Sequence, residues 1–136
     1  MSTENKEIIR RLIDEVWNQR EIHVLDEIIA ADAFIHSPTV PNLSHGPEGA
    51  KQYVQLFWAA FPDLRVSIEE IIAEGDSLAV RITWQGTHEG EFMGVPPTGK
   101  SIVSSGVDIL HVRHDKVVEA WHYSDDSAVR QIGSAR

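Results

Sequence analysis

The chain has 136 residues, 42% of them hydrophobic, which predicts one domain over residues 1–136 built around one core. Twelve Lys and Arg side chains against 21 Asp and Glu give a net charge of −9, which argues against nucleic-acid partners and anionic membrane surfaces. The sequence has no cysteine, no signal-peptide core at its N-terminus and no apolar run near the roughly 20 residues of a membrane helix, so we expect a cytoplasmic protein without thiolate chemistry.

The first half of the sequence has helical periodicity. Apolar residues at this spacing predict an amphipathic first helix and a shorter second helix: Ile8, Ile9, Leu12, Ile13, Val16 and Trp17, then Val24, Leu25, Ile28 and Ile29. Residues 33–36 predict a brief strand. Pro47 is well placed as the first residue of a third helix that ends at residues 61–63, with Tyr53, Leu56, Phe57 and Ala60 as its buried stripe.

From Arg65 onward the spacing is that of strands. Alternating apolar residues predict strands around residues 66–68, 78–84, 102–112 and 117–123, with turns at Gly75-Asp76 and His114-Asp115. Residues 127–132 can form one or two helical turns, which we expect Asp125 to cap. Helices followed by a mainly antiparallel meander predict an α+β domain whose helices cover one face of a curved sheet.

One excursion, residues 86–99, interrupts the alternation between two strands. It contains four glycines and the pair Pro96-Pro97, which allow tight turns and stiffen the return. We expect Phe92 and Met93 to anchor this segment, because a flexible linker would not need large apolar residues.

Several motifs occur together in an order that resembles the SnoaL-like polyketide cyclase (ester cyclase) family over nearly the full chain. They are Glu15-Val16-Trp17-Asn18, Phe34-Ile35-His36, Gly46-Pro47-Glu48-Gly49, Phe61-Pro62-Asp63-Leu64, residues 86–99, and the tail from Trp121 through Asp125 to Gln131-Ile132-Gly133. The resemblance implies a cystatin-like, nuclear-transport-factor-two-like cone in which three helices and a strongly curved sheet enclose an apolar pocket. It also implies a homodimer or larger homo-oligomer, with residues 86–99 shaping a pocket lid or an oligomer contact.

His122 and Asp108 are the strongest candidates for chemistry. Four other histidines lie near turns or polar edges and are interpreted as surface residues: His23, His45, His111 and His114. Asp108 lies among apolar strand residues and needs a partner if it is buried. A two-residue turn would pair it with Trp121, whereas a three-residue loop or a bulge would pair it with His122. The spacing leaves both registers open, and the resemblance favours His122.

The resemblance implies a cofactor-free intramolecular aldol closure, in which a base removes a proton next to a carbonyl. The family places an acid/base pair at these two positions, and in this chain the histidine and the aspartate are exchanged. We expect His122 to be the general base and Asp108 to fix its tautomer and orientation. The alternative is a structural His–Asp hydrogen bond in a pocket whose activity is lost or altered.

Five further residues are candidates for substrate binding. His36 matches a family asparagine and either replaces a lost hydrogen-bond donor or closes the pocket mouth. His88 belongs to a Gly-Thr-His motif, where bonding to the loop's own backbone is favoured over a ligand contact. Gly106 replaces a polar side chain that lies near the pair in the family. Trp58 and Phe92 supply aromatic surface for the core, the pocket wall or an interface.

Three functions therefore compete. The first is an enzyme that cyclises or isomerises an enolisable carbonyl compound. The second is a non-catalytic domain that binds a small apolar carbonyl ligand. The third is an epoxide hydrolase, which ranks lower because only one acid is evident. A metal site made of His36, His122 and Asp108 lacks characteristic ligand spacing, so we expect no metal and no cofactor.

Overall fold

A computed structural model describes residues 2–37, 40, 42–124 and 127–133. The helices are α1 (Ser2–Arg10), η1 (Arg11–Asn18), α2 (Val24–Ile28), α3 (Pro47–Ala60) and α4 (Ser127–Gly133). The strands are β1 (Ile29–His36), β2 (Arg65–Glu74), β3 (Ser77–Thr87), β4 (Ser101–Arg113) and β5 (Lys116–Ser124). The predicted α+β class and the predicted order of elements are confirmed.

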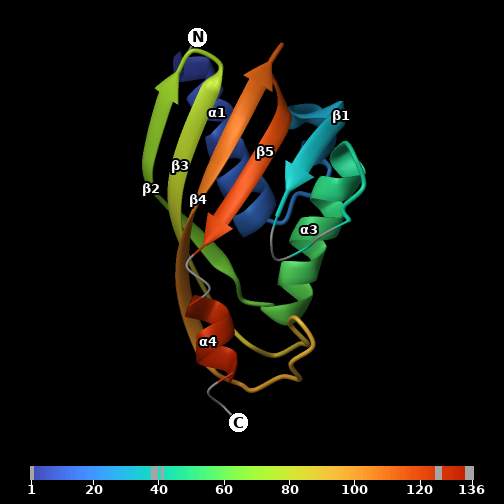
Figure 1. The fold of residues 1–136 in the computed structure, drawn as a ribbon, viewed down its shortest axis with the longest axis vertical. Coiled ribbons are helices and arrows are strands. Elements are labelled where there is room, and N and C mark those ends of the chain that lie inside the picture. Colours follow the sequence, from blue (N-terminus) through green and yellow to red (C-terminus); the bar gives the residue numbers. More distant parts are fainter. Residues whose placement is uncertain (1, 38–39, 41, 125–126, 134–136) are drawn as a thin grey trace.

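The strands form one curved sheet in the order β1-β5-β4-β3-β2. Neighbouring strands from β2 to β5 are antiparallel, and β1 runs parallel to β5. Figure 1 shows α1 and η1 behind the sheet, α3 beside β1, and α4 at the opposite end of the molecule from the N-terminus. None of the helices in the described part of the chain has the length and apolar character that crossing a bilayer requires.

The first helix changes its geometry halfway along its length. α1 is an ordinary α-helix, whereas its continuation η1 is a π-helix. Ile13 and Val16 of η1 are buried, as the periodicity predicts. Trp17 lies with its ring 6.0 Å from the ring of Tyr53 and 5.9 Å from that of Phe57, so the wider helix joins the aromatic packing of α3.

The third helix begins at Pro47 as predicted, and of its expected stripe Phe57 and Ala60 are buried and Tyr53 packs against the core. The buried residues are Gly49, Ala50, Val54, Phe57 and Ala60. Leu56 is 38% exposed, so its assignment to the core is wrong. Adjacent helical positions are separated by about 100°, and a stripe centred on Val54 and Phe57 therefore turns Leu56 towards solvent. β1 also begins earlier than expected, at Ile29, directly after α2.

A bulge in β5 sets the register at the centre of the sheet. The turn residues His114 and Asp115 both have positive φ, 54° and 63°, as a two-residue hairpin turn requires. Val112 pairs with Val117, but His111 pairs with Glu119, so Val118 is an additional residue in the ladder. From there Leu110 pairs with Ala120 and Asp108 pairs with His122. The register is therefore the one that the resemblance favoured.

The segment between β3 and β4 is anchored to the end of α3. The backbone N–H groups of Glu89 and Gly90 both donate to the carbonyl oxygen of Ala60, at 3.0 and 3.1 Å. A Cβ at Gly90 would lie 2.1 Å from the carbonyl oxygen of Ala59, so this contact requires glycine. Phe92 is buried as predicted, whereas Met93 is 51% exposed and the expectation that it anchors the segment is wrong. Asp125, the expected cap of α4, lies outside the described residues.

Candidate active site

The side chains of His122 and Asp108 form a hydrogen bond between strands β5 and β4. The Nδ1 atom of His122 donates to the Oδ1 atom of Asp108. Both side chains are largely withdrawn from solvent, with exposed fractions of 18% and 22%. Because a carboxylate only accepts hydrogen bonds, this contact places the proton of a neutral imidazole on Nδ1 and leaves the lone pair on Nε2. Nε2 can therefore accept a proton from a bound molecule.

Two small cavities lie beside this pair, with volumes of about 40 and 80 Å³. Both are lined by Trp17, Tyr53, Asp108 and His122. Each cavity is also lined by one further tryptophan. The remaining described residues around them are apolar, such as Phe57 in the first cavity and Leu110 in the second. The His122–Asp108 pair is thus surrounded by mainly apolar walls.

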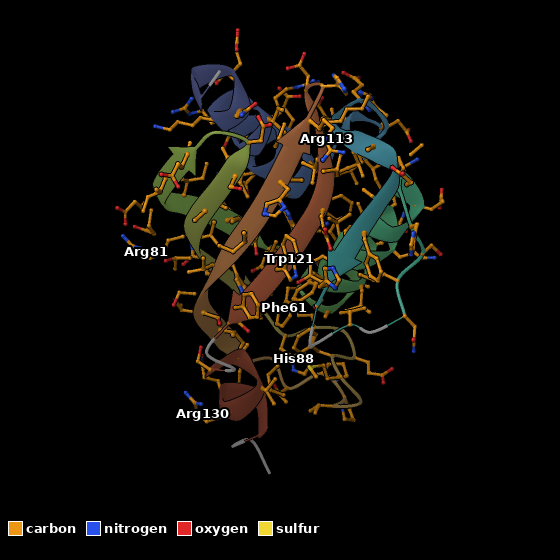
Figure 2. The ribbon with its side chains drawn as sticks, turned by 45° about the horizontal axis from the view of Figure 1, so that its top comes forward. Phe61, Arg81, His88, Arg113, Trp121 and Arg130 are labelled. Atoms are coloured by element: carbon orange, nitrogen blue, oxygen red, sulfur yellow. The ribbon has the colours of Figure 1, made fainter. Side chains whose placement is uncertain are left out.

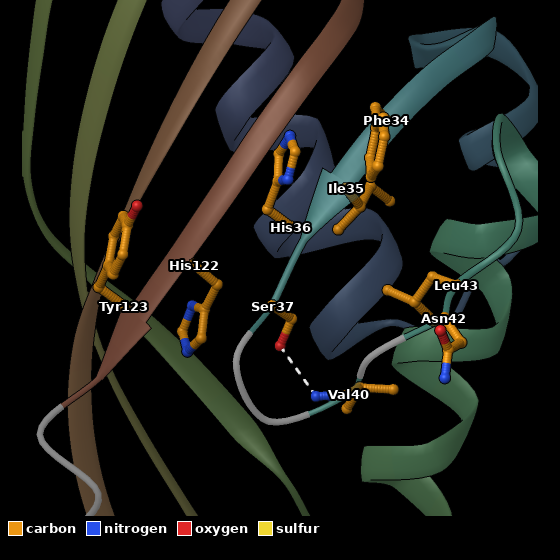
Figure 3. Close-up of a pocket in the computed structure, with 9 residues that line it drawn as sticks. All are labelled: Phe34, Ile35, His36, Ser37, Val40, Asn42, Leu43, His122 and Tyr123. Atoms are coloured by element: carbon orange, nitrogen blue, oxygen red, sulfur yellow. Dashed lines mark hydrogen bonds between the residues drawn. The ribbon is translucent and has the colours of Figure 1, made fainter.

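His122 also borders two larger cavities, of about 550 and 340 Å³. The larger one lies at the end of β1 and is lined by Phe34, Ile35, His36 and Ser37, among others. Figure 3 shows His122 of β5 and Ser37 among the residues that line this cavity, so the imidazole also borders space outside the two small cavities.

Tyr53 is a functional candidate that the sequence reasoning assigned only to the core. It lies on α3, and the centre of its ring is 6.2 Å from the centre of the His122 ring. Burial raises the pKa of Tyr53 well above its ordinary value, and the negative charge of Asp108 raises it further, while a hydrogen bond with Ser37 lowers it. The phenol therefore stays protonated. A hydroxyl in an otherwise apolar helical stripe is the signal that could have identified it.

Gly106 allows the close approach of the two strands beside the pair. A Cβ at this position would lie 2.6 Å from the carbonyl oxygen of Tyr123 and 3.1 Å from Cε1 of His122. The missing side chain therefore makes room for the imidazole. We expected Gly106 as a substrate-binding position, and the structure brings it against His122.

His36 lies on the opposite face of the sheet from the pair. Its Nε2 atom is 2.7 Å from Oε2 of Glu119, and its ring is stacked between Phe34 and Trp121, at 4.3 and 5.1 Å. His36 also lines the larger outer cavity that reaches His122. Within the described residues no three potential metal ligands form a cluster, so the structure does not bring His36, His122 and Asp108 together as a metal site.

His88 is fully buried in the connection between β3 and β4. Its Nδ1 atom is 2.9 Å from the hydroxyl of Thr98 and accepts from the backbone N–H of Thr98 at 3.2 Å. Figure 2 shows His88 in the same part of the molecule as Phe61, whose ring is 5.7 Å away. His88 lines none of the four cavities that His122 borders. Its contacts are those of a residue that holds the segment in shape.

Trp58 and Phe92 differ in whether they line a cavity beside His122. The indole nitrogen of Trp58 donates to the carbonyl oxygen of Trp17 at 3.3 Å, so Trp58 supports a cavity-lining residue from behind. Phe92 packs against Phe57 and Phe61, with ring centres 5.3 and 5.1 Å apart, and lines the 340 Å³ cavity together with His122. Phe92 therefore lines a cavity that the His122 imidazole also borders, whereas Trp58 lines none of the four cavities around His122.

The sequence matches a family model described as SnoaL-like polyketide cyclase over residues 7–132. No curated protein matches the chain. Solved structures of similar proteins cover it almost completely. A candidate polyketide cyclase from Acidithiobacillus ferrooxidans is 29% identical over 100% of this chain and 99% of its own, with a TM-score of 0.87.

Two further structures agree with this match. A candidate SnoaL-like polyketide cyclase from Jannaschia sp. CCS1 is 28% identical, covers 98% of this chain and 94% of its own, and has a TM-score of 0.88. IdmH, a candidate polyketide cyclase from Streptomyces antibioticus, is 34% identical over 95% of this chain and 98% of its own, with a TM-score of 0.81. The cone fold implied by the resemblance is confirmed.

Proposed function

The chain belongs to the SnoaL-like polyketide cyclase family, and from this premise we propose that it closes or isomerises an enolisable carbonyl compound by acid/base catalysis. The observation that carries the proposal is the His122–Asp108 hydrogen bond at the wall of two apolar cavities. A base that faces an apolar space suits a substrate whose acidic hydrogen is bound to carbon between or beside carbonyl groups.

In the first proposed step, Nε2 of His122 takes a proton from the α-carbon of the substrate. The C–H electron pair moves into the carbonyl group, which gives an enolate, and the imidazole becomes an imidazolium. Asp108 stabilises that cation through the bond to Nδ1 and keeps the ring in one orientation. The negative charge of Asp108 therefore stabilises the site most strongly after proton transfer, when the His122 ring is positively charged.

In the second proposed step, the enolate carbon attacks another carbonyl carbon of the same molecule. A carbon–carbon bond forms, the attacked C=O becomes an alkoxide, and Nε2 returns its proton to that oxygen. The product is an isomer of the substrate, and His122 is restored to its starting form. These steps transfer only a proton and rearrange electron pairs within the substrate, so we propose that they proceed without a cofactor.

Exchange of α-hydrogens in deuterated buffer tests this proposal without knowledge of the natural substrate. The apolar ketone 2-tetralone has an activated methylene whose proton NMR signal disappears as deuterium replaces hydrogen. We expect the wild-type protein to accelerate this loss over buffer alone. No acceleration of exchange would contradict the proposal, and saturable binding of 2-tetralone without acceleration would favour a non-catalytic binding domain.

A further inference from the structure

We propose that Tyr53 donates the hydrogen bond that stabilises the enolate oxygen while His122 holds the abstracted proton. This inference rests on the proposed function and names a further catalytic residue for it. Tyr53 reaches the site from α3, whereas the acid/base pair comes from β4 and β5. The phenol and the pair thus face the two small cavities from opposite layers of the fold.

The ring of Tyr53 is held in place by aromatic neighbours. Its centre is 6.0 Å from that of Trp17, with the rings at 90°, and 5.1 Å from that of Phe57, with the rings at 45°. His122 lies 6.2 Å away at 61°. Side chains fixed in this way do not have to reorganise when charge develops, which is the requirement for an effective oxyanion donor.

Ser37 is a polar neighbour of the phenol. The backbone N–H of Val40 donates to Oγ of Ser37 at 3.2 Å, a bond drawn in Figure 3. The Ser37 side chain lowers the pKa of Tyr53, an effect smaller than the opposite effects of burial and of Asp108. Ser37 also lines the 550 Å³ cavity that His122 borders.

The charges around the two small cavities favour Tyr53 for this role. Asp108 can only accept hydrogen bonds when ionised, and its negative charge would repel an enolate. Tyr53 remains a neutral donor because burial and the charge of Asp108 both raise the pKa of its phenol. A hydrogen bond to a developing anion in an apolar cavity is stronger than the same bond in water.

The variant Tyr53→Phe tests the inference, because it removes the hydroxyl and keeps the ring packed against Trp17 and Phe57. Ser67→Ala is the control, since it removes a hydroxyl from an exposed residue that lines none of the four cavities that His122 borders. We expect Tyr53→Phe to slow 2-tetralone exchange by about 10²- to 10³-fold, and Ser67→Ala to exchange at the wild-type rate. Thermal unfolding checks that both variants are folded.

Binding of 4-nitrophenol provides a readout that does not depend on turnover. Its phenolate carries a negative oxygen like that of an enolate, whereas nitrobenzene has a similar shape and no such oxygen. We expect Tyr53→Phe to weaken phenolate binding by about tenfold and to leave nitrobenzene binding within about twofold of wild type. An equal loss for both compounds would indicate a packing defect and overturn the inference.

The two proposals fail in different ways. If the wild-type protein accelerates exchange and Tyr53→Phe accelerates it equally, the role of Tyr53 is wrong and the proposed function stands. If the wild-type protein does not accelerate exchange, the proposed function is contradicted and the enolate role of Tyr53 is lost with it.

Discussion

His122 and Asp108 lie opposite each other because one additional residue, Val118, separates Val117 from Glu119 in the β4–β5 ladder. Without it, Asp108 would face Trp121, and His122 would lie on the other side of the sheet. The bulge allows Val117 to be buried while Ala120 and His122 also face inwards. A single inserted residue thus places the proposed base, His122, beside the apolar cavities.

Replacement of His122 by glutamine removes the proposed base and keeps a polar side chain of similar reach. We expect His122→Gln to reduce 2-tetralone exchange by about 10²- to 10⁴-fold, the usual contribution of a general base. The measurement is loss of the methylene signal by NMR in deuterated buffer. The control is His23→Gln, which removes an exposed imidazole and should exchange at the wild-type rate; an equal loss in both variants would count against a specific role for His122.

Replacement of Asp108 by asparagine should change which nitrogen of His122 carries the proton. The amide can donate to Nδ1, which moves the proton to Nε2 and removes the basic site. We expect an exchange rate lower by on the order of 10² and a change in the ¹⁵N shifts of the His122 ring. Glu119→Gln, which alters the other His–carboxylate pair of the described residues, should leave those shifts unchanged. Unaltered His122 shifts in Asp108→Asn would show that Asp108 does not set the tautomer.

Gly106→Ala introduces a methyl group at the wall of the site. The new Cβ would lie 2.6 Å from the carbonyl oxygen of Tyr123 and 3.1 Å from His122 Cε1, so the backbone and the imidazole must both shift. We expect a loss of about 1–3 kcal/mol in the free energy of unfolding, together with slower exchange, measured by urea denaturation and NMR.

Gly75→Ala is the control that distinguishes a general loss of stability from displacement of the His122 side chain. Gly75 has a φ of 59° and no atom within 4 Å of the added Cβ, so alanine there costs about 1–2 kcal/mol from backbone strain alone. We expect this variant to be less stable and to exchange normally. If its exchange falls as far as that of Gly106→Ala, crowding of His122 is not the cause.

Asp63 connects the end of α3 to β3 and makes stability depend on pH. Its carboxylate accepts hydrogen bonds from the backbone N–H of Thr87 at 2.7 Å and from the Thr87 hydroxyl at 2.8 Å, and the backbone bond is the main cause that lowers the pKa of Asp63. Because the pKa is lower in the folded state, this stabilisation is complete above the ordinary carboxyl pKa of about 4 and is lost as the pH falls through the folded value.

Asp63→Asn should therefore destabilise the protein at pH 7 and have little effect in acid. Asp63 is exposed, so we expect a difference of only about 0.5–1 kcal/mol at pH 7. Urea denaturation of both proteins between neutral and acidic pH measures it, with Asp14→Asn as a control for loss of an exposed carboxylate. A difference that grows as the pH falls would contradict this sign.

The sequence predicted the order of elements well, because caps and turns are local signals. Pro47 at the start of α3 and the His114-Asp115 turn are both where their residue types predicted them. The exposed Leu56 and Met93 were misplaced because a hydrophobic side chain does not reveal by itself which side of its element faces the core. Tertiary packing decided both positions.

The candidate site was less predictable than the fold. Asp108 and His122 could be named from their types and their strand positions, but their pairing depended on a bulge that alternation alone does not reveal. Tyr53 was missed as a site residue because its ring fits a core stripe, and only the distance to His122 shows its proximity to the pair. Long-range register and helix placement supply this information, and neither is encoded in a short window of sequence.

A double-mutant cycle on 2-tetralone exchange tests the central claim most directly, with wild type, His122→Gln, Asp108→Asn and the double variant. If Asp108 acts through His122, the double variant should exchange at the same rate as His122→Gln, because the orienting group has no role once the base is gone. Wild-type exchange in His122→Gln, or an Asp108→Asn loss that multiplies fully on the His122→Gln background, would contradict the account.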